Sequence, residues 1–254
     1  MTTSFAFRSL GLEHGDAAAL LQTGVRTLDA LPEGGASLRW YVAQQPTLVL
    51  GRGQAAPTRL ATGLPTGLPM VQRPSGGGAV LMDADLLSLD VVLPAGHPWL
   101  DGGLSEVFVH VGHAWAGALA ELGVVDLEVY DGPSTARRLG TPREQLLTAV
   151  CFALPGKGEV LHQGRKLVGL AQRRRQHGAL IQCGLLRRWD PTLLLQVFDP
   201  VQDPVHQQDG DPRAEIWAEV RSAAVGLETL LVPAPDNTKI IETVERWVMR
   251  TLDG

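Results

Sequence analysis

Residues 147–186 read LTAVCFALPGKGEVLHQGRKLVGLAQRRRQHGALIQCGLL, and the rest of the chain is interpreted outward from them. The stretch contains an apolar run that ends in Cys151, a Pro-Gly turn, and two short strands joined through a small-residue step at Gly169 and Ala171. A Gln-Gly-Arg-Lys bend precedes the second strand. The stem of Lys166 is therefore expected between two strands, where its ammonium group can meet a carbonyl oxygen.

Composition limits the size and class of the protein. The chain has 254 residues, 44% of them hydrophobic, and no break in composition, so we expect one domain over residues 1–254 with a helical C-terminal extension at about 200–254. A formal charge of −5 argues against nucleic acid as a ligand, because no surplus of Lys and Arg exists to release counterions. We see neither a secretory leader nor an apolar run near the roughly 20 residues of a membrane span, so no membrane association is expected.

The two cysteines, Cys151 and Cys183, fit no zinc or disulfide pattern, which suits a reducing cytoplasm and predicts a cytoplasmic protein. His110 and His113 stand three residues apart, which could be metal spacing. No third ligand stands beside them in the sequence, so a solvated or packed histidine pair is favoured and no metal site is expected.

Apolar periodicity predicts the remaining elements. Helices are expected at 11–31, 104–122, 189–197, 213–231 and 236–252. Strands are expected as a hairpin at 38–50, on both sides of a glycine run at 69–81, and at 82–94 and 124–131, with loops at 132–146 and 199–212. Asp16 is placed to cap the first helix, and Gly123 to end the second.

The glycine run is the second motif, Arg73-Pro-Ser75-Gly76-Gly77-Gly78-Ala79. Three consecutive glycines let the backbone approach a ligand closely and turn several N–H groups toward one point, which suits an anion or a carbonyl. No Gly-Lys-Ser/Thr follows, so the segment is not a Walker loop. A flexible hairpin tip is the structural alternative. Arg73 could hold a phosphate or a carboxylate, or could extend to solvent.

Three motifs together resemble a known family: Leu50-Gly-Arg-Gly-Gln54, Arg73-Pro-Ser-Gly-Gly-Gly-Ala-Val80 and Gly164-Arg-Lys166-Leu-Val-Gly-Leu-Ala-Gln172. Their order across roughly residues 10–190 resembles the catalytic domain shared by lipoate-protein ligases, octanoyl and lipoyl transferases and biotin-protein ligases. The resemblance implies an α+β fold with a central mixed, largely antiparallel sheet flanked by helices. It also implies an acyl tunnel under the glycine loop, with Lys166 directed at the acyl carbonyl. Acyl or substrate binding is thereby implied for Arg73, Ser75, Gly76, Gly77, Gly78, Ala79, Gly169, Ala171 and Gln172.

Within that family, the position of Cys151-Phe152 before Lys166 most resembles the octanoyltransferases that use a cysteine nucleophile. The resemblance implies that the thiolate accepts an octanoyl or lipoyl group from a thioester and passes it to a lysine, without a cofactor. Lys166 would lower the thiol pKa and donate to the oxyanion. The implied donor is an acyl carrier protein or an acylated H protein, and the implied acceptor a lipoyl domain or the glycine cleavage H protein.

Other interpretations of the same residues stay open. A free cysteine such as Cys151 is also a common small core residue, and Cys183 is interpreted as core. The triplet at 173–175, three arginines, offers a docking patch for an acidic acceptor or is an ordinary solvated strand end.

Two residues depart from the family pattern. Gln72 stands where relatives usually have the first of two arginines, and Met82 where a histidine commonly precedes the aspartate that matches Asp83. If that histidine acts as a base, this protein uses another base or works differently. Two further functions therefore stay open: an ATP- and Mg-dependent lipoate (less readily biotin) ligase acting through an acyl-adenylate, and a non-catalytic acyl- or carrier-protein-binding module.

Overall fold

A seven-stranded sheet forms the centre of the protein in the computed structural model, which describes residues 7–31, 35–56, 67–133, 141–198 and 212–252. The strand order is β1-β2-β6-β10-β9-β8-β7, with β1 parallel to β2 and each of the other neighbouring pairs antiparallel. The strands are β1 (Phe7–Gly15), β2 (Ala36–Ala43), β6 (Leu86–Pro94), β7 (Leu127–Val129), β8 (Val160–His162), β9 (Arg165–Arg175) and β10 (Gly178–Leu186). The expected α+β class with a mixed, largely antiparallel sheet is confirmed.

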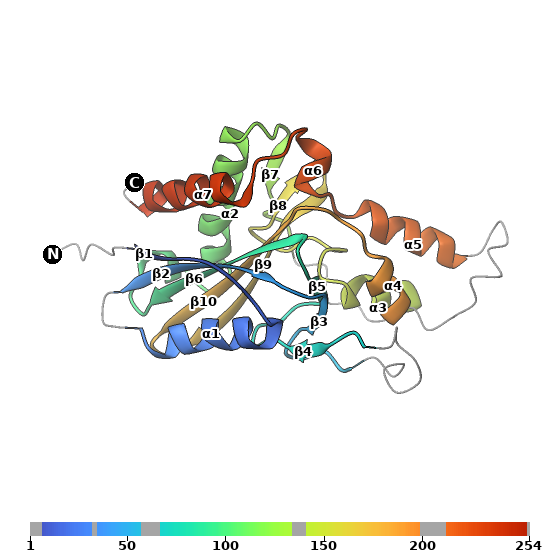
Figure 1. Cartoon of the computed structure of the whole chain (residues 1–254), viewed down its shortest axis with the longest axis horizontal. Coiled ribbons are helices and arrows are strands. Elements are labelled where there is room, and N and C mark those ends of the chain that lie inside the picture. The colour runs from blue at the N-terminus through green and yellow to red at the C-terminus, as the bar shows by residue number, and fades with distance from the viewer. Residues whose placement is uncertain (1–6, 32–34, 57–66, 134–140, 199–211, 253–254) are drawn as a thin grey trace.

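Helices cover both faces of this sheet. Figure 1 shows α1 on one side, where it packs on β6 and β10, and α2 with α7 on the other. The helices are α1 (Ala17–Asp29), η2 (Pro98–Leu100), α2 (Glu106–Glu121), α3 (Pro142–Ala149), α4 (Thr192–Phe198), α5 (Pro212–Ser222), α6 (Leu227–Leu230) and α7 (Asn237–Leu252). In the described part of the chain, no helix combines the length and apolar character needed to cross a membrane.

A second, three-stranded sheet carries the glycine loop. It has the order β4-β3-β5, from β3 (Thr47–Leu50), β4 (Met70–Gln72) and β5 (Val80–Met82). The two strands expected at 38–50 are present, but the expected hairpin between them is wrong. The β2 strand is paired on both edges by β1 and β6, so the chain leaves the main sheet at Gln44 and starts the small sheet with β3.

The central stretch contains longer strands than expected. Gly169 and Ala171 do not form a step between two short strands but lie inside β9, which pairs along its length with β10. The bend before β9 is present, and Gln163 and Gly164 have the positive φ angles of 50° and 75° that a tight turn requires. Cβ atoms on successive strand residues point to opposite faces, so β9 can present small residues to one face along several pleats.

Several helix boundaries also differ from expectation. Residues 11–15, expected as the start of the first helix, belong instead to β1. This edge strand is mostly exposed and lacks apolar alternation, so no strand pattern is visible in the sequence. Asp16 caps α1 as expected, accepting from the Ala19 N–H, and Gly123 ends α2 at a φ of 102°. The helix expected at 213–231 is broken between α5 and α6, and the loop expected at 199–212 lies outside the described residues up to 211.

Residues 142–146 are helical rather than part of a loop, because Thr141 and Glu144 form a capping box that starts α3. The rest of that expected loop falls partly outside the described residues, at 134–140.

Candidate active site

Cys151 follows Val150, the residue at which α3 ends and the chain becomes extended and bridges to Ala79 at the end of the glycine loop. The Cys151 N–H donates to the Ala79 carbonyl at 2.8 Å, and the Ala79 N–H donates to the Ala149 carbonyl at 2.6 Å. This pairing requires Gly78, because a Cβ there would lie 2.7 Å from the Thr148 oxygen and 2.9 Å from the Cys151 nitrogen. The third glycine therefore joins two segments that are distant in sequence.

Arg73 holds the glycine loop in its shape from within. Its side chain is 5% exposed, and its Nη2 donates to the carbonyls of Gly76 at 2.7 Å and Gly78 at 2.8 Å. A Cβ on Gly77 would lie 2.8 Å from that Nη2 and 4.0 Å from the Cys151 sulfur. The guanidinium group and the sulfur therefore border the same small space. That space stays open because Gly77 has no side chain.

Lys166 lies beside the main chain of the cysteine. Its side chain is 3% exposed, and its ammonium group donates to the Cys151 carbonyl at 2.7 Å and the Leu154 carbonyl at 3.0 Å. Its third contact is an ion pair with Glu159 Oε2 at 2.6 Å. Three oxygen atoms of the protein therefore engage the three N–H groups of the lysine in this structure.

Glu159 is the partner that sequence reasoning missed. Its buried carboxylate also accepts from the backbone N–H groups of Gly156 at 2.6 Å and Leu170 at 3.0 Å. Burial raises the pKa of Glu159, and the positive charge of Lys166 opposes that rise. The available signal was that Glu159 is the only acidic residue between Glu144 and Asp190, a stretch that includes the lysine. A carboxylate that becomes buried there needs a partner.

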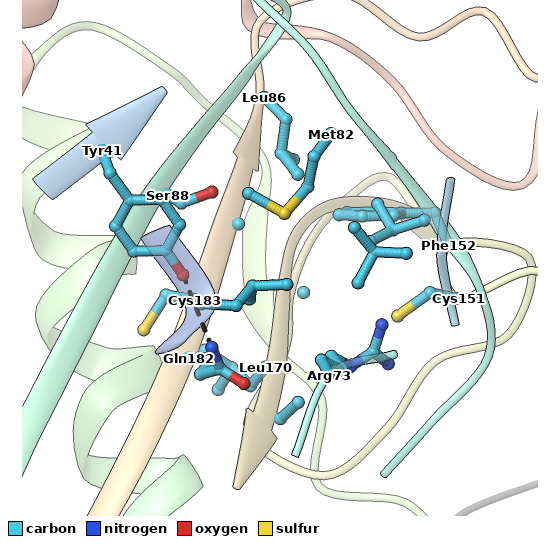
Figure 2. A pocket seen from close by; sticks show the side chains of 16 residues that line it. Tyr41, Arg73, Met82, Leu86, Ser88, Cys151, Phe152, Leu170, Gln182 and Cys183 are labelled. Carbon is cyan, nitrogen blue, oxygen red and sulfur yellow. Dashed lines mark hydrogen bonds between the residues drawn. The ribbon is translucent and has the colours of Figure 1, made fainter. Parts of the chain in front are cut away.

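A pocket opens next to Cys151. It encloses about 460 Å³ of empty space, counted to its open mouth, and Figure 2 shows Cys151, Phe152 and Arg73 at one end with Tyr41, Ser88 and Cys183 toward the other. The wall is mostly apolar and includes small residues that leave room. Its lining is Leu21, Tyr41, Val49, Arg73, Val80, Met82, Leu86, Ser88, Cys151, Phe152, Gly169, Leu170, Ala171, Gln182, Cys183 and Gly184. We call this the main pocket.

The residues expected to bind substrate divide between the pocket and its surroundings. Arg73, Gly169 and Ala171 line the main pocket, as does Cys151. The others do not line it: Lys166, Ser75, Gly76, Gly77, Gly78, Ala79 and Gln172. Gln172 follows Ala171 on β9 and so lies on the opposite face of the strand, where its Nε2 is buried without a hydrogen-bond partner among the described residues.

Ser75 anchors the glycine loop to the main sheet. Its hydroxyl donates to Gln182 Oε1 at 2.7 Å, and Gln182 Nε2 reaches the Tyr41 hydroxyl at 3.5 Å. That hydroxyl donates to Asp90 Oδ1 at 3.0 Å, and Arg39 donates to Asp90 Oδ2 at 3.0 Å. A buried polar chain therefore runs from the loop along one side of the pocket.

Asp90 is the acidic residue in this series of buried hydrogen bonds. Burial raises its pKa to about 6, against the opposing effect of Arg39. Helix α1 approaches so closely that a Cβ on Gly24 would lie 2.3 Å from Asp90 Oδ2, so only glycine fits there. This contact fixes α1 against the sheet and places Leu21 at the pocket wall.

The two cysteines occupy different environments. Cys183 is 3% exposed in the core, and burial raises the pKa of its thiol to about 12. Cys151 is partly exposed at the pocket. A thiol must ionise to act as a nucleophile, so Cys151 is the reactive candidate of the two.

Comparison with known proteins places this site in a family. The model of the lipoyl protein ligase A/B catalytic domain matches residues 18–247. The chain belongs to this family. The expected resemblance is therefore confirmed, and the match covers all the site residues described above.

Curated members of the lipoyl protein ligase A/B family align with much of this chain. Octanoyltransferase LipM of Moorella thermoacetica is 37% identical over 152 residues, which are 57% of this chain and 53% of that protein. Octanoyltransferase LipM of Geobacillus kaustophilus is 31% identical over 202 residues, 76% of this chain and 69% of that protein. The chain thus spans about half the length of the first of these relatives.

Solved structures share the fold of this lipoyl protein ligase A/B chain. Lipoate-protein ligase A bound with ATP has a TM-score of 0.69 at 19% identity, covering 97% of this chain and 85% of that one. Protein Ta0514 of T. acidophilum, solved with bound lipoic acid, has a TM-score of 0.70 at 17% identity, with the same coverage of 97% and 85%. At these identities the likeness establishes the arrangement of the sheet and helices.

Two positions where the chain departs from the family pattern have structural roles here. Gln72 Nε2 donates to the carbonyls of Arg52 at 3.0 Å and Gly51 at 3.2 Å, and so ties β4 to the turn after β3. Met82 is 3% exposed and lines the main pocket. It contributes an apolar side chain to the wall at the position where the resemblance led us to expect histidine.

Proposed function

We propose that this chain transfers an octanoyl or lipoyl group to the lysine of a lipoyl domain or of the glycine cleavage H protein, through a thioester on Cys151. The observation that carries the proposal is the thiol of Cys151 beside an apolar pocket. An alkyl chain gains about 0.8 kcal/mol per buried CH₂ group in such surroundings. Relatives named octanoyltransferase support the same acyl group.

In the first step, the Cys151 thiolate attacks the carbonyl carbon of an acyl thioester. A new C–S bond forms to Cys151, the C–S bond to the donor breaks, and the donor leaves as a thiol after taking up a proton. One thioester replaces another, so the step needs neither ATP nor another cofactor. The donor is an acyl carrier protein or an acylated H protein.

In the second step, the acceptor lysine amine attacks the thioester carbon. An amide C–N bond forms and the C–S bond to Cys151 breaks, while the proton that the amine loses returns to the thiolate. The transfer is favourable because an amide is more stable than a thioester. Lys166 supports both steps by fixing the Cys151 and Leu154 carbonyls. It donates to the oxyanion once one of its three present contacts is released.

The test is direct labelling. The protein is incubated with an octanoyl thioester, its intact mass is measured, and peptide mapping identifies which cysteine carries the acyl group. We expect one octanoyl adduct on Cys151 that is absent from the Cys151→Ala variant, and its transfer to an added lipoyl domain. An adduct that persists in the variant would refute the mechanism. So would pyrophosphate release from octanoate and ATP that survives loss of the thiol.

A further inference from the structure

A second cavity lies beside the main pocket, on the other side of Arg73. It encloses about 720 Å³ of empty space, counted to the solvent, and shares Leu21 and Arg73 with the main pocket. Its lining comes from α1, β4, the turn after β3 and β9: Ala18, Leu21, Gln22, Val25, Arg52, Val71, Gln72, Arg73, Pro74 and Arg173. We call it the arginine cavity.

The charge in this cavity has one sign. Arg52, Arg73 and Arg173 line it, and the described lining residues include no carboxylate. Burial lowers the pKa of Arg173, and the charges of Arg175 and Arg52 lower it further, while Asp29 opposes them. Arg173 Nε is buried and has no hydrogen-bond partner among the described residues. Mutually repelling cations with an unused donor favour an anion, which would relieve the repulsion and accept the hydrogen bond.

The backbone holds these arginines in place. The Arg52 N–H donates to the Ser75 carbonyl at 2.8 Å, and its own carbonyl accepts from Gln72 at 3.0 Å. Arg173 reaches the Pro74 carbonyl from β9 at 3.5 Å. Two segments that border the glycine loop therefore present their guanidinium groups from fixed positions, as recognition of a planar or tetrahedral oxyanion requires.

Strand alternation separates the arginine triplet. Arg173 faces the arginine cavity, whereas Arg174 points to the opposite face of β9 and donates to the Leu100 carbonyl at 2.7 Å and the Gly103 carbonyl at 3.3 Å. The triplet is therefore not one continuous patch. Its role in docking an acidic acceptor stays a prediction.

We propose that the arginine cavity binds the phosphate of a phosphopantetheine arm that presents the acyl thioester to Cys151. This inference rests on the proposed function. In such a donor the acyl chain enters the main pocket, the thioester lies at its mouth beside Cys151, and the phosphate lies at the far end of a flexible arm. The phosphate therefore needs a site outside the acyl pocket and within reach of a flexible arm whose thioester lies beside Cys151. The arginine cavity adjoins the main pocket through Leu21 and Arg73 and so lies within that reach.

The experiment compares two donors that differ only in the phosphate, octanoyl-phosphopantetheine and octanoyl-pantetheine. The rate of Cys151 acylation is measured with each, and their ratio of kcat/KM is the readout, so that any general loss of activity cancels. We expect the wild-type protein to prefer the phosphorylated donor by about tenfold or more, as hydrogen bonds to a charged group allow. The preference should shrink at high salt.

The variants assign this preference to the cavity. Arg52→Gln and Arg173→Gln together should bring the ratio close to one. Arg174→Gln removes the same charge from the same strand on its other face and should retain the wild-type ratio. A wild-type ratio near one, or an unchanged ratio in the double variant, overturns the proposal.

Two further measurements distinguish the possible failures. The first is calorimetric measurement of phosphopantetheine binding to the Cys151→Ser variant, which requires no acyl transfer. If binding depends on Arg52 and Arg173 but the wild-type protein transfers no acyl group, the proposed function fails and the phosphate site stands. If instead the double variant raises the KM for ATP in an octanoate-dependent reaction while the donor ratio stays at one, the phosphate belongs to a nucleotide and the thioester-arm proposal fails.

Discussion

Lys166 Nζ donates a 2.7 Å hydrogen bond to the main-chain carbonyl of Cys151, so the ammonium group and the thiol belong to one local structure. The same nitrogen contacts Leu154 and Glu159, and the Cys151 N–H is held by Ala79 of the glycine loop. The lysine, the cysteine and the loop therefore converge. Substitutions in the lysine, the cysteine and the loop can be distinguished by measuring acylation rate, unfolding free energy and thiol labelling.

Lys166→Ala should slow acylation of Cys151 by about a hundredfold, because it removes the support of the cysteine carbonyl and the ammonium group that we propose donates to the oxyanion once one of its contacts is released. Lys157→Ala is the matched control. Lys157 is partly exposed, forms an ion pair with Glu106 at 2.8 Å, and does not line the main pocket that contains the thiol. Single-turnover acylation by an octanoyl thioester measures both. Equal rates in the two variants would remove Lys166 from the mechanism.

Glu159→Gln should lower the free energy of unfolding by about 3 kcal/mol or more, because it leaves the buried ammonium of Lys166 without its counter-charge. Glu219→Gln breaks the exposed pair with Arg143 and should cost about 1 kcal/mol or less. Urea denaturation of the two variants and the wild type gives the comparison. Similar losses in both variants would mean that the buried pair carries no special weight.

Gly78→Ala should strongly reduce the acylation rate, because its Cβ would collide with the backbone of Thr148 and Cys151 and displace the proposed nucleophile. Gly76→Ala should be tolerated, since a Cβ there meets no atom within 4 Å. Thiol labelling and acylation kinetics of both variants measure this difference. Equal sensitivity at the two positions would contradict the packing described for the loop.

Asp90 should make the protein less stable as pH rises from about 4 to about 6. Its folded pKa of about 6 exceeds the usual value of about 3.9, so the folded state binds more protons than the unfolded state between these values. Relative to Asp90→Asn, the wild type should lose up to roughly 3 kcal/mol across this window. Urea unfolding of both proteins over the window measures it. A wild type that instead gains stability with rising pH would show that Arg39 dominates over burial.

The motifs that identify the family were readable in the sequence because each depends on residue types close together in the chain. Gly76, Gly77 and Gly78 were recognisable as a backbone-approach motif, and Cys151 and Lys166 as a candidate pair. Asp16 and Gly123 marked helix ends correctly because capping involves only neighbouring residues. The capping box of Thr141 and Glu144 was equally local, yet the surrounding Pro and Gly residues favoured a loop.

Contacts that join distant segments were beyond such reasoning. Glu159 looked like one more acidic residue until the fold buried it against Lys166, and Arg52 and Arg173 fall in separate motifs that share a cavity only after β9 packs beside the glycine loop.

Local chemistry along the chain was therefore enough to identify the α+β class and the family and to propose Cys151 as a nucleophile, because side-chain type and spacing act over a few residues. The partner of each charged group, the face of β9 on which an arginine lies and the outline of the pocket depended on packing between segments. Burial and pairing are properties of the folded surroundings, and no residue carries them alone.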